Sequence, residues 1–190
     1  MATSATADMR YVVDTRVSQF TVQAFASGLI SAIAHSPKIA IRDWSGAVQM
    51  ASDGMDHASL KVRVNARSLE VLDELRDDDR RMFHRVMNQE VLESKTFPEV
   101  LYESSEVKAE RLKDDLYRLA VQGRLNLHGV TNEQGLVAQV AFGVDSARAH
   151  GSFTLLQSDY NIRIASIAGG TMKLQDELKF YFYVVARKSE

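Results

Sequence analysis

Apolar and polar residues alternate along most of this chain, as in β-strands with one dry and one wet face. In residues 59–66, every second residue from Leu60 to Ala66 is apolar, and the residues between them are polar. Successive side chains of a strand point to opposite sides of the sheet, so this spacing buries one set and hydrates the other. The same pattern predicts strands at residues 19–24, 118–128, 136–144 and 178–184, with weaker ones at 38–50, 100–107 and 151–157.

Short polar segments separate these strands. Ala51–Gly54 contains an Asp-Gly pair typical of a hairpin, and Lys113–Asp115 and Thr131–Gly135 are further predicted turns. Short connections favour antiparallel pairing, because parallel strands need long crossovers. About eight strands with one apolar face must bury that face, either between the two sheets of a sandwich or inside a closed barrel. The alternation alone does not decide between these two architectures.

One segment, about residues 79–93, has a helical period instead. Its apolar residues recur at a spacing close to 3.6, so that they form one face of a helix; they are Met82, Phe83, Val86, Met87, Val91 and Leu92. Asp78 or Asp79 is the expected N-cap, and Pro98 requires the helix to end before Phe97. We expect this helix to act as a flap or plug against the sheet.

Composition excludes several classes of protein. The chain has 190 residues, a net charge of −2 and no cysteine, so disulfides, thiolate metal sites and cysteine nucleophiles are impossible. The balanced charge argues against a broad nucleic-acid-binding surface. The sequence contains no run of 18 apolar residues, so no membrane-spanning helix is predicted. We expect residues 1–10 to be a disordered leader and residues 11–190 to form a single domain. Since residues 1–10 do not have the pattern of a secretory signal, we expect a cytoplasmic protein.

Several short motifs occur in a characteristic order along the chain. They are Tyr11–Asp14, Phe97–Val100, the G-x-L-x-L-H-G-V-T element at Gly123–Thr131, Ser158–Ile162 and Met172–Leu178. In this order they resemble the YceI-like family of lipid-binding proteins over roughly residues 11–187. The resemblance implies a mainly β protein: an extended, antiparallel, lipocalin-like β-barrel of about eight strands. It also implies that the apolar interior binds an isoprenoid or another long-chain lipid, and that the protein forms a homodimer.

If the barrel is hollow, the residues of the dry faces line a tube that binds the ligand. These ligand-binding candidates are Phe20, Val22, Trp44, Val62, Val64, Tyr102, Val121, Leu125, Phe142, Phe153, Phe180 and Phe182. The alternative is that they only pack against one another. Buried phenol and indole groups need partners, so Tyr102, Tyr160 and Trp44 either mark polar points along the tube or reach the surface.

Two histidines and a set of basic residues complete the binding candidates. His35, beside the turn at Ser36-Pro37, either caps the turn or points inward to the ligand. His128, within the G-x-L-x-L-H-G-V-T element, either fixes a turn or contacts the ligand. Basic residues on the wet faces are either solvated or recruited by a pyrophosphate or carboxylate headgroup at a barrel mouth; they are Arg42, Lys61, Arg63, Arg118 and Arg124.

Three functions remain open at this point. The first is a non-catalytic carrier or storage protein for a long-chain apolar ligand. The second is a structural barrel with a filled core, whose exposed helix and tyrosine-rich last strand form a dimer or partner face, with Tyr181 and Tyr183 on the polar face of that strand. The third is an enzyme that uses a His/Asp pair in the tube, for example with Asp159 or Asp176. The histidines lack metal-ligand spacing, and no phosphate loop, G-x-S-x-G motif or paired carboxylate occurs, so no catalytic residue, metal or cofactor is predicted.

Overall fold

A computed structural model describes residues 9–27, 36–51, 54–164, 166–167 and 172–189. The elements in chain order are β1 (Met9–Val13), β2 (Gln19–Ser27), β3 (Lys38–Ile41), β4 (Trp44–Ala51), β5 (Gly54–Asn65), η1 (Ala66–Ser68), β6 (Leu69–Val71), α1 (Asp77–Val86), η2 (Met87–Val91), β7 (Glu99–Lys113), β8 (Leu116–Leu127), β9 (Val130–Phe142), β10 (Ser146–Leu156), η3 (Gln157–Tyr160), β11 (Ser166–Ile167) and β12 (Met172–Ser189). Since β1 begins at Met9, the sheet starts two residues before the boundary expected for the leader, and residues 1–8 lie outside the described part.

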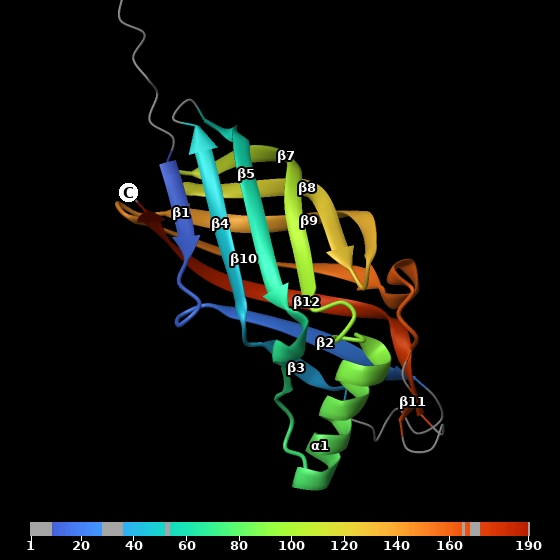
Figure 1. The fold of residues 1–190 in the computed structure, drawn as a ribbon. Coiled ribbons are helices and arrows are strands. Elements are labelled where there is room, and N and C mark those ends of the chain that lie inside the picture. Colours follow the sequence, from blue (N-terminus) through green and yellow to red (C-terminus); the bar gives the residue numbers. More distant parts are fainter. Residues whose placement is uncertain (1–8, 28–35, 52–53, 165, 168–171, 190) are drawn as a thin grey trace, which may run out of the picture.

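The sheet closes into an antiparallel barrel, as predicted. Its ring runs β1-β4-β5-β7-β8-β9-β10-β12, and β12 returns to β1 through pairs from Arg10↔Ser189 to Val13↔Ala186. A sandwich would have left two separate sheets, so this pairing of the first and last strands excludes that alternative. Figure 1 shows the strands enclosing a common interior.

The wall of the barrel extends beyond this ring on one side. Strand β12 pairs with β1 near its C-terminal end but with β2 over residues 173–183, and β3 and β6 follow β2 in the sheet. The edge of this extension is β6, and α1 comes next in the chain (Figure 1). The predicted strand at 38–50 is therefore two strands, β3 and β4, separated at Arg42 and Asp43.

The helical excursion is present but begins earlier than predicted. α1 spans Asp77–Val86, and a π-helical turn, η2, continues it to Val91. Arg76 is the N-cap, and Asp78 and Asp79 lie in the first turn instead of at the cap. The acidic residues still lie at the positive end of the helix dipole, as predicted. The predicted N-cap residue, however, was wrong.

One predicted turn was also wrong. Residues 131–135 belong to β9, and the turn that joins β8 to β9 lies at His128 and Gly129. Both residues have positive φ, 52° and 76°, as the central pair of a tight type I′ hairpin requires. Thr131 and Glu133 are exposed on the outer face of β9, whereas the Gln134 side chain donates to the carbonyls of Gly135 and Thr154 and lines the cavity. The turn at Asp114 and Asp115 lies where we predicted it, whereas residues 52 and 53 lie outside the described part.

Candidate functional site: an apolar cavity in the barrel

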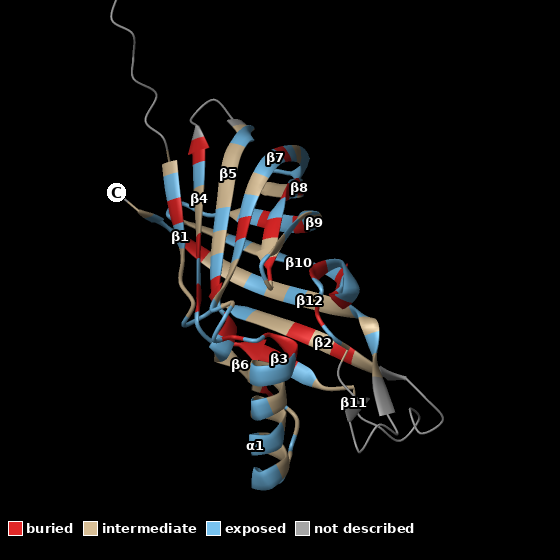
Figure 2. Cartoon of the chain, turned by 45° about the vertical axis from the view of Figure 1, so that its right-hand side comes forward, coloured by how far each residue is buried: buried red, intermediate tan, exposed pale blue. Residues whose placement is uncertain are grey.

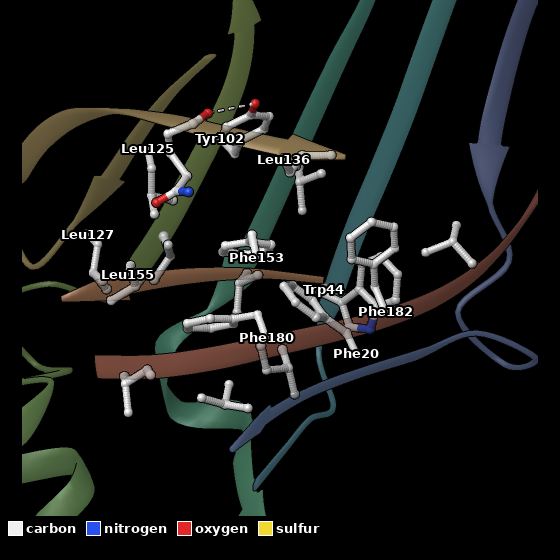
Figure 3. A pocket seen from close by; sticks show the side chains of 18 of the residues that line it. Phe20, Trp44, Tyr102, Leu125, Leu127, Leu136, Phe153, Leu155, Phe180 and Phe182 are labelled. Carbon is white, nitrogen blue, oxygen red and sulfur yellow. Dashed lines mark hydrogen bonds between the residues drawn. The ribbon is translucent and has the colours of Figure 1, made fainter. Parts of the chain in front are cut away.

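The interior of the barrel is an open cavity of about 750 Å³. Its walls come from the inward faces of the ring strands and of β2, β3 and β6, together with α1 and η2. Figure 3 shows Phe20, Trp44, Phe153, Phe180 and Phe182 arranged around this space. Binding sites for small molecules are commonly about 300–1,000 Å³ and mostly apolar, so both the size and the lining fit a ligand site.

The burial of the inward residues shows that side chains do not fill the interior. Phe153, Phe180 and Phe182 line the cavity but are only half-buried, because their inner surfaces border open space. Buried residues form three clusters, centred on β7 and β8, on Trp44 and Ile39, and on Tyr11. Half-buried residues that border the cavity, such as Phe180, pack against two of these clusters. Figure 2 shows buried and exposed positions alternating along the strands.

Aromatic rings form a connected row across the cavity wall. The rings of Phe153 and Phe180 are stacked, with centroids 4.7 Å apart and an interplanar angle of 4°. Phe180 lies 6.1 Å from Phe20, which meets Trp44 edge-on at 5.6 Å. These rings come from β10, β12, β2 and β4, so the row links strands that are far apart in sequence.

All the strand residues predicted to line a tube do line this cavity: Phe20, Val22, Trp44, Val62, Val64, Tyr102, Val121, Leu125, Phe142, Phe153, Phe180 and Phe182. That they contact a ligand stays a prediction. His35 lies outside the described residues. The described cavity wall does not include His128, so its placement gives no support to a ligand contact.

His128 instead joins motifs that are distant in sequence. Its Nδ1 lies 3.2 Å from the backbone oxygen of Tyr160, and its ring lies 4.4 Å from that of Phe97. Its Nε2 faces Glu93 Oε1 at 3.5 Å. A side chain on Gly129 would collide with the Phe97 ring at 2.6 Å. The Phe-Pro step and the G-x-L-x-L-H-G-V-T element therefore pack against each other, which supports the turn-fixing alternative for His128.

Most polar groups of the cavity wall are already hydrogen-bonded to the protein. The Tyr102 hydroxyl donates to the Gln134 carbonyl at 3.1 Å (Figure 3), and burial raises the pKa of Tyr102 to about 12. The Gln157 side chain donates to the Gln175 carbonyl at 2.9 Å. Tyr160 is buried but is not part of the described wall, so it is not a polar point of the tube.

Charge is confined to one end of the cavity. Over the part of the chain that the structure describes, no lysine, arginine or histidine lines the wall, whereas Asp73 and Asp79 do. The basic residues considered for a headgroup lie elsewhere. Arg42 pairs with Glu70 at 2.7 Å, Lys61 with Glu103 at 2.6 Å, and Arg63 with Glu99. These pairs lower the pKa of Glu70 and of Glu103, through a hydrogen bond to Arg42 and to Lys61 respectively.

The sequence reasoning missed part of the wall. Met82, Phe83, Val86 and Met87 of the helical segment line the cavity, as do Ile39, Ile41, Leu69 and Val71 of the sheet extension. The helical apolar period marks the first group, but that period alone does not show what the apolar face covers. Among the described residues, no group of three acidic or histidine side chains forms a metal site, and no helix is long and apolar enough to cross a membrane.

The sequence profile of the YceI-like domain matches residues 11–186. No curated protein matches the sequence significantly.

Solved structures with the same fold have low sequence identity to this chain. BcnA of Burkholderia cenocepacia is 17% identical, with a TM-score of 0.69 over 91% of this chain and 98% of that one. A polyisoprenoid-binding domain from Saccharophagus degradans, implicated in plant cell wall breakdown, is 11% identical, with a TM-score of 0.67 over 94% and 98%. The Campylobacter jejuni YceI protein is 17% identical, with a TM-score of 0.61 over 83% and 88%.

Proposed function

Because the chain belongs to the YceI-like domain family, we propose that it binds a long-chain apolar ligand, an isoprenoid or another lipid, inside the barrel as a non-catalytic carrier or storage protein. The observation that carries the proposal is the continuous apolar cavity of about 750 Å³. The structural similarity to a polyisoprenoid-binding domain of Saccharophagus degradans adds support for this class of ligand.

Water is a poor occupant of this cavity. At about 30 Å³ per molecule in the liquid, the volume corresponds to roughly 25 waters, and each buried water needs two to four polar partners. The wall offers few such partners, since it is mostly apolar and the donors of Tyr102 and Gln157 are already used by backbone carbonyls. Covering apolar surface contributes about 25 cal/mol per Å², so an apolar chain that replaces the water is favoured.

The first test asks whether the protein carries a ligand when it is isolated. Freshly purified protein is extracted with organic solvent, and the extract is analysed by mass spectrometry. We expect a stoichiometric long-chain isoprenoid or other lipid, and a protein that rebinds the extracted fraction. An extract free of lipid, from a protein that also fails to bind any long-chain isoprenoid or fatty compound, would overturn the proposal.

The second test fills the cavity without touching the outer surface. Ala149 on β10 points into the cavity between Val140 and Val184, so Ala149→Phe places a ring in the open space. Ala141 on β9 is exposed, and Ala141→Phe is the matched outward control. We expect Ala149→Phe to fold and to lose at least tenfold in ligand affinity, whereas Ala141→Phe binds as the wild type does.

The stability of the same variant separates a hollow barrel from a filled one. Added volume in a packed core costs about 1–3 kcal/mol of unfolding free energy. In the open cavity we expect Ala149→Phe to cost less than about 1 kcal/mol, measured by urea unfolding after lipid extraction. A cost near 3 kcal/mol together with unchanged lipid binding would favour the structural barrel instead.

The remaining expectations stay predictions. An enzyme with a His/Asp pair in the tube gains no support, because among described residues the cavity wall contains no histidine. A homodimer is consistent with the exposed Tyr181 and Tyr183 on β12, and sedimentation of the double variant Tyr181→Ser/Tyr183→Ser tests that face. The cytoplasmic location is tested by fractionation of cells that produce the natural chain.

A further inference from the structure

The side chain of Trp44 places a hydrogen-bond donor in the apolar wall of the cavity. Trp44 lies at the start of β4, is 9% exposed and packs edge-on against Phe20. Its indole N–H donates to no acceptor among the residues that the structure describes, in contrast to the donors of Tyr102 and Gln157. Buried indole N–H groups usually find a partner, so this one needs an explanation.

The unpaired nitrogen of Trp44 faces open space. In the described part of the chain, only His128 Nε2 is a side-chain nitrogen or oxygen that is both sealed from open space and without a hydrogen bond. The Trp44 nitrogen also has no hydrogen bond to a described residue, so it borders open space. Since Trp44 lines the cavity, we infer that this space is the cavity.

The charges of the cavity wall disfavour an ionised ligand group as the acceptor for this N–H. An ionised group moved from water into an apolar interior is very costly unless an opposite charge pairs with it. The described wall has no basic side chain, and its charged residues, Asp73 and Asp79, are acidic. A phosphate or carboxylate beside Trp44 would therefore lose its hydration without gaining a counter-charge.

From these observations we propose that Trp44 is a specificity residue whose indole N–H binds an uncharged acceptor oxygen of the ligand inside the barrel. The ligand class is an isoprenoid or other long-chain lipid with a neutral carbonyl, ether or hydroxyl oxygen, as opposed to a pyrophosphate or a fatty carboxylate. This inference rests on the proposed function and specifies the chemistry of the same cavity. The remaining length of the ligand lies along the apolar wall, where burial alone favours it.

The test compares three probes with the same number of isoprene units: a methyl ketone, a hydrocarbon and a pyrophosphate. Their affinities are measured by displacement of a fluorescent apolar probe from lipid-extracted protein. One net hydrogen bond corresponds to an affinity gain of about 3–10-fold. We expect the wild type to bind the ketone tighter than both other probes by about that factor.

Variants assign the preference to a residue. Trp44→Phe keeps an aromatic ring but removes the donor, and we expect it to bind the ketone and the hydrocarbon equally, with hydrocarbon affinity within about twofold of the wild type, since one hydrogen bond is lost and little packing. Tyr181→Phe removes a hydroxyl from the outer face of β12 and should keep the wild-type ranking. Trp44 is also the only tryptophan, so its emission reports the contact directly. The ketone should shift this emission to longer wavelength than the hydrocarbon does.

The outcomes that overturn the proposal are distinct from a failure of the carrier function. A ketone preference that survives Trp44→Phe, or equal losses for ketone and hydrocarbon, would show that Trp44 only packs. Loss of the preference in Tyr11→Phe instead would move the donor to Tyr11, because Tyr11 also lines the cavity and its hydroxyl donates no hydrogen bond among the described residues. Tightest binding of the pyrophosphate would refute the neutral headgroup while leaving the carrier intact. No binding of any probe would refute both.

Discussion

The ring of Tyr102 occupies the space that a side chain on Gly123 would need. A Cβ on Gly123 would lie 2.6 Å from the Tyr102 ring and hydroxyl, and equally close to the Glu103 carbonyl. Gly123 opens the G-x-L-x-L-H-G-V-T element, and its lack of a side chain lets Tyr102 lie across β8 and reach the Gln134 carbonyl. The glycine of this motif is therefore explained by packing inside the cavity wall.

Gly123→Ala should accordingly destabilise the barrel. The new methyl group has to displace the Tyr102 ring or the β7 backbone, and such overpacking costs about 1–3 kcal/mol. Urea unfolding measures the loss. Gly143→Ala is the matched control, because there the nearest atom is Ser146 Oγ at 3.3 Å, and we expect a change below about 0.5 kcal/mol. Equal effects of the two substitutions would contradict the packing explanation.

Asp14 ties the first strand to the last, and this contact makes the stability depend on pH. Its carboxylate accepts from Arg16 Nε at 2.9 Å and from Arg187 Nε at 3.1 Å, which holds the pKa of Asp14 well below its ordinary value of 3.8. A carboxyl group with a lowered pKa in the folded state contributes stability above its ordinary pKa and loses it as the pH falls toward the folded value. The contribution is therefore complete at pH 7 and declines below about pH 4.

Asp14→Asn should lower the urea midpoint at pH 7, and the difference from the wild type should shrink at pH 3. The physical reason is that at pH 3 the unfolded wild-type chain already takes up a proton at Asp14, which stabilises the unfolded state and offsets part of the ion pair's contribution. Asp115→Asn, in the exposed turn between β7 and β8, is the control and should show no such convergence. A gap between wild type and Asp14→Asn that stays constant from pH 7 to pH 3 would refute the closure contact as the cause.

Tyr102 predicts a second pH dependence at the alkaline end. Burial raises its pKa from 10.0 to about 12, so the folded state keeps the phenol proton that the unfolded chain releases. The unfolded state then binds fewer protons between pH 10 and pH 12, and the free energy of unfolding falls as the pH rises through that window. Unfolding curves at pH 9, 10.5 and 11.5 should show a steeper decline for the wild type than for Tyr102→Phe. Parallel declines would mean that the hydroxyl is not shielded.

His128 should be structural, since it joins the β8–β9 turn to the segment after the helix. His128→Ala removes the contacts to the Tyr160 carbonyl and to the Phe97 ring, and we expect a loss of about 1–3 kcal/mol in the free energy of unfolding. His150→Ala, at an exposed position on β10, should change it by less than about 0.5 kcal/mol. A His128→Ala protein of normal stability but reduced ligand affinity would restore the ligand role considered for this residue.

The helical segment should respond to the ligand more than the barrel does. α1 contains no buried residue (Figure 2). Met82 on its apolar face is 58% exposed although it lines the cavity. Elements with few buried contacts open at low free energy, so the amides of α1 should exchange with deuterium faster than those of β8. Lipid extraction should accelerate exchange in α1 and leave β8 unchanged. Identical exchange in α1 before and after extraction would show that the helix does not cover the ligand.

The sequence by itself determined most of the long strands, their inward residues and the helical excursion, but not β1, β6 or the division between β3 and β4. The alternation of apolar and polar residues is a local property of the sequence. Once residues 59–66 are extended, successive side chains face opposite sides of the sheet, so Val62 and Val64 must face the same side. That is why all the predicted strand residues of the tube lie on the cavity wall. The ordered motifs predicted the family and, through it, the closed barrel.

Only the tertiary structure decided that the interior is open, which strands form the sheet extension, and what the helix covers. Alternation fixes the direction of the Phe153 and Phe180 side chains but not the width of the barrel, which depends on how many strands close into the ring and on how they are staggered. The wrong turn at residues 131–135 has the same origin, because a polar strand end and a turn share a composition and only pairing with β8 separates them. Only the tertiary structure likewise shows that the Trp44 N–H has no acceptor among the described residues. Local patterns specify orientation, whereas distances across a fold come from contacts between residues far apart in the chain.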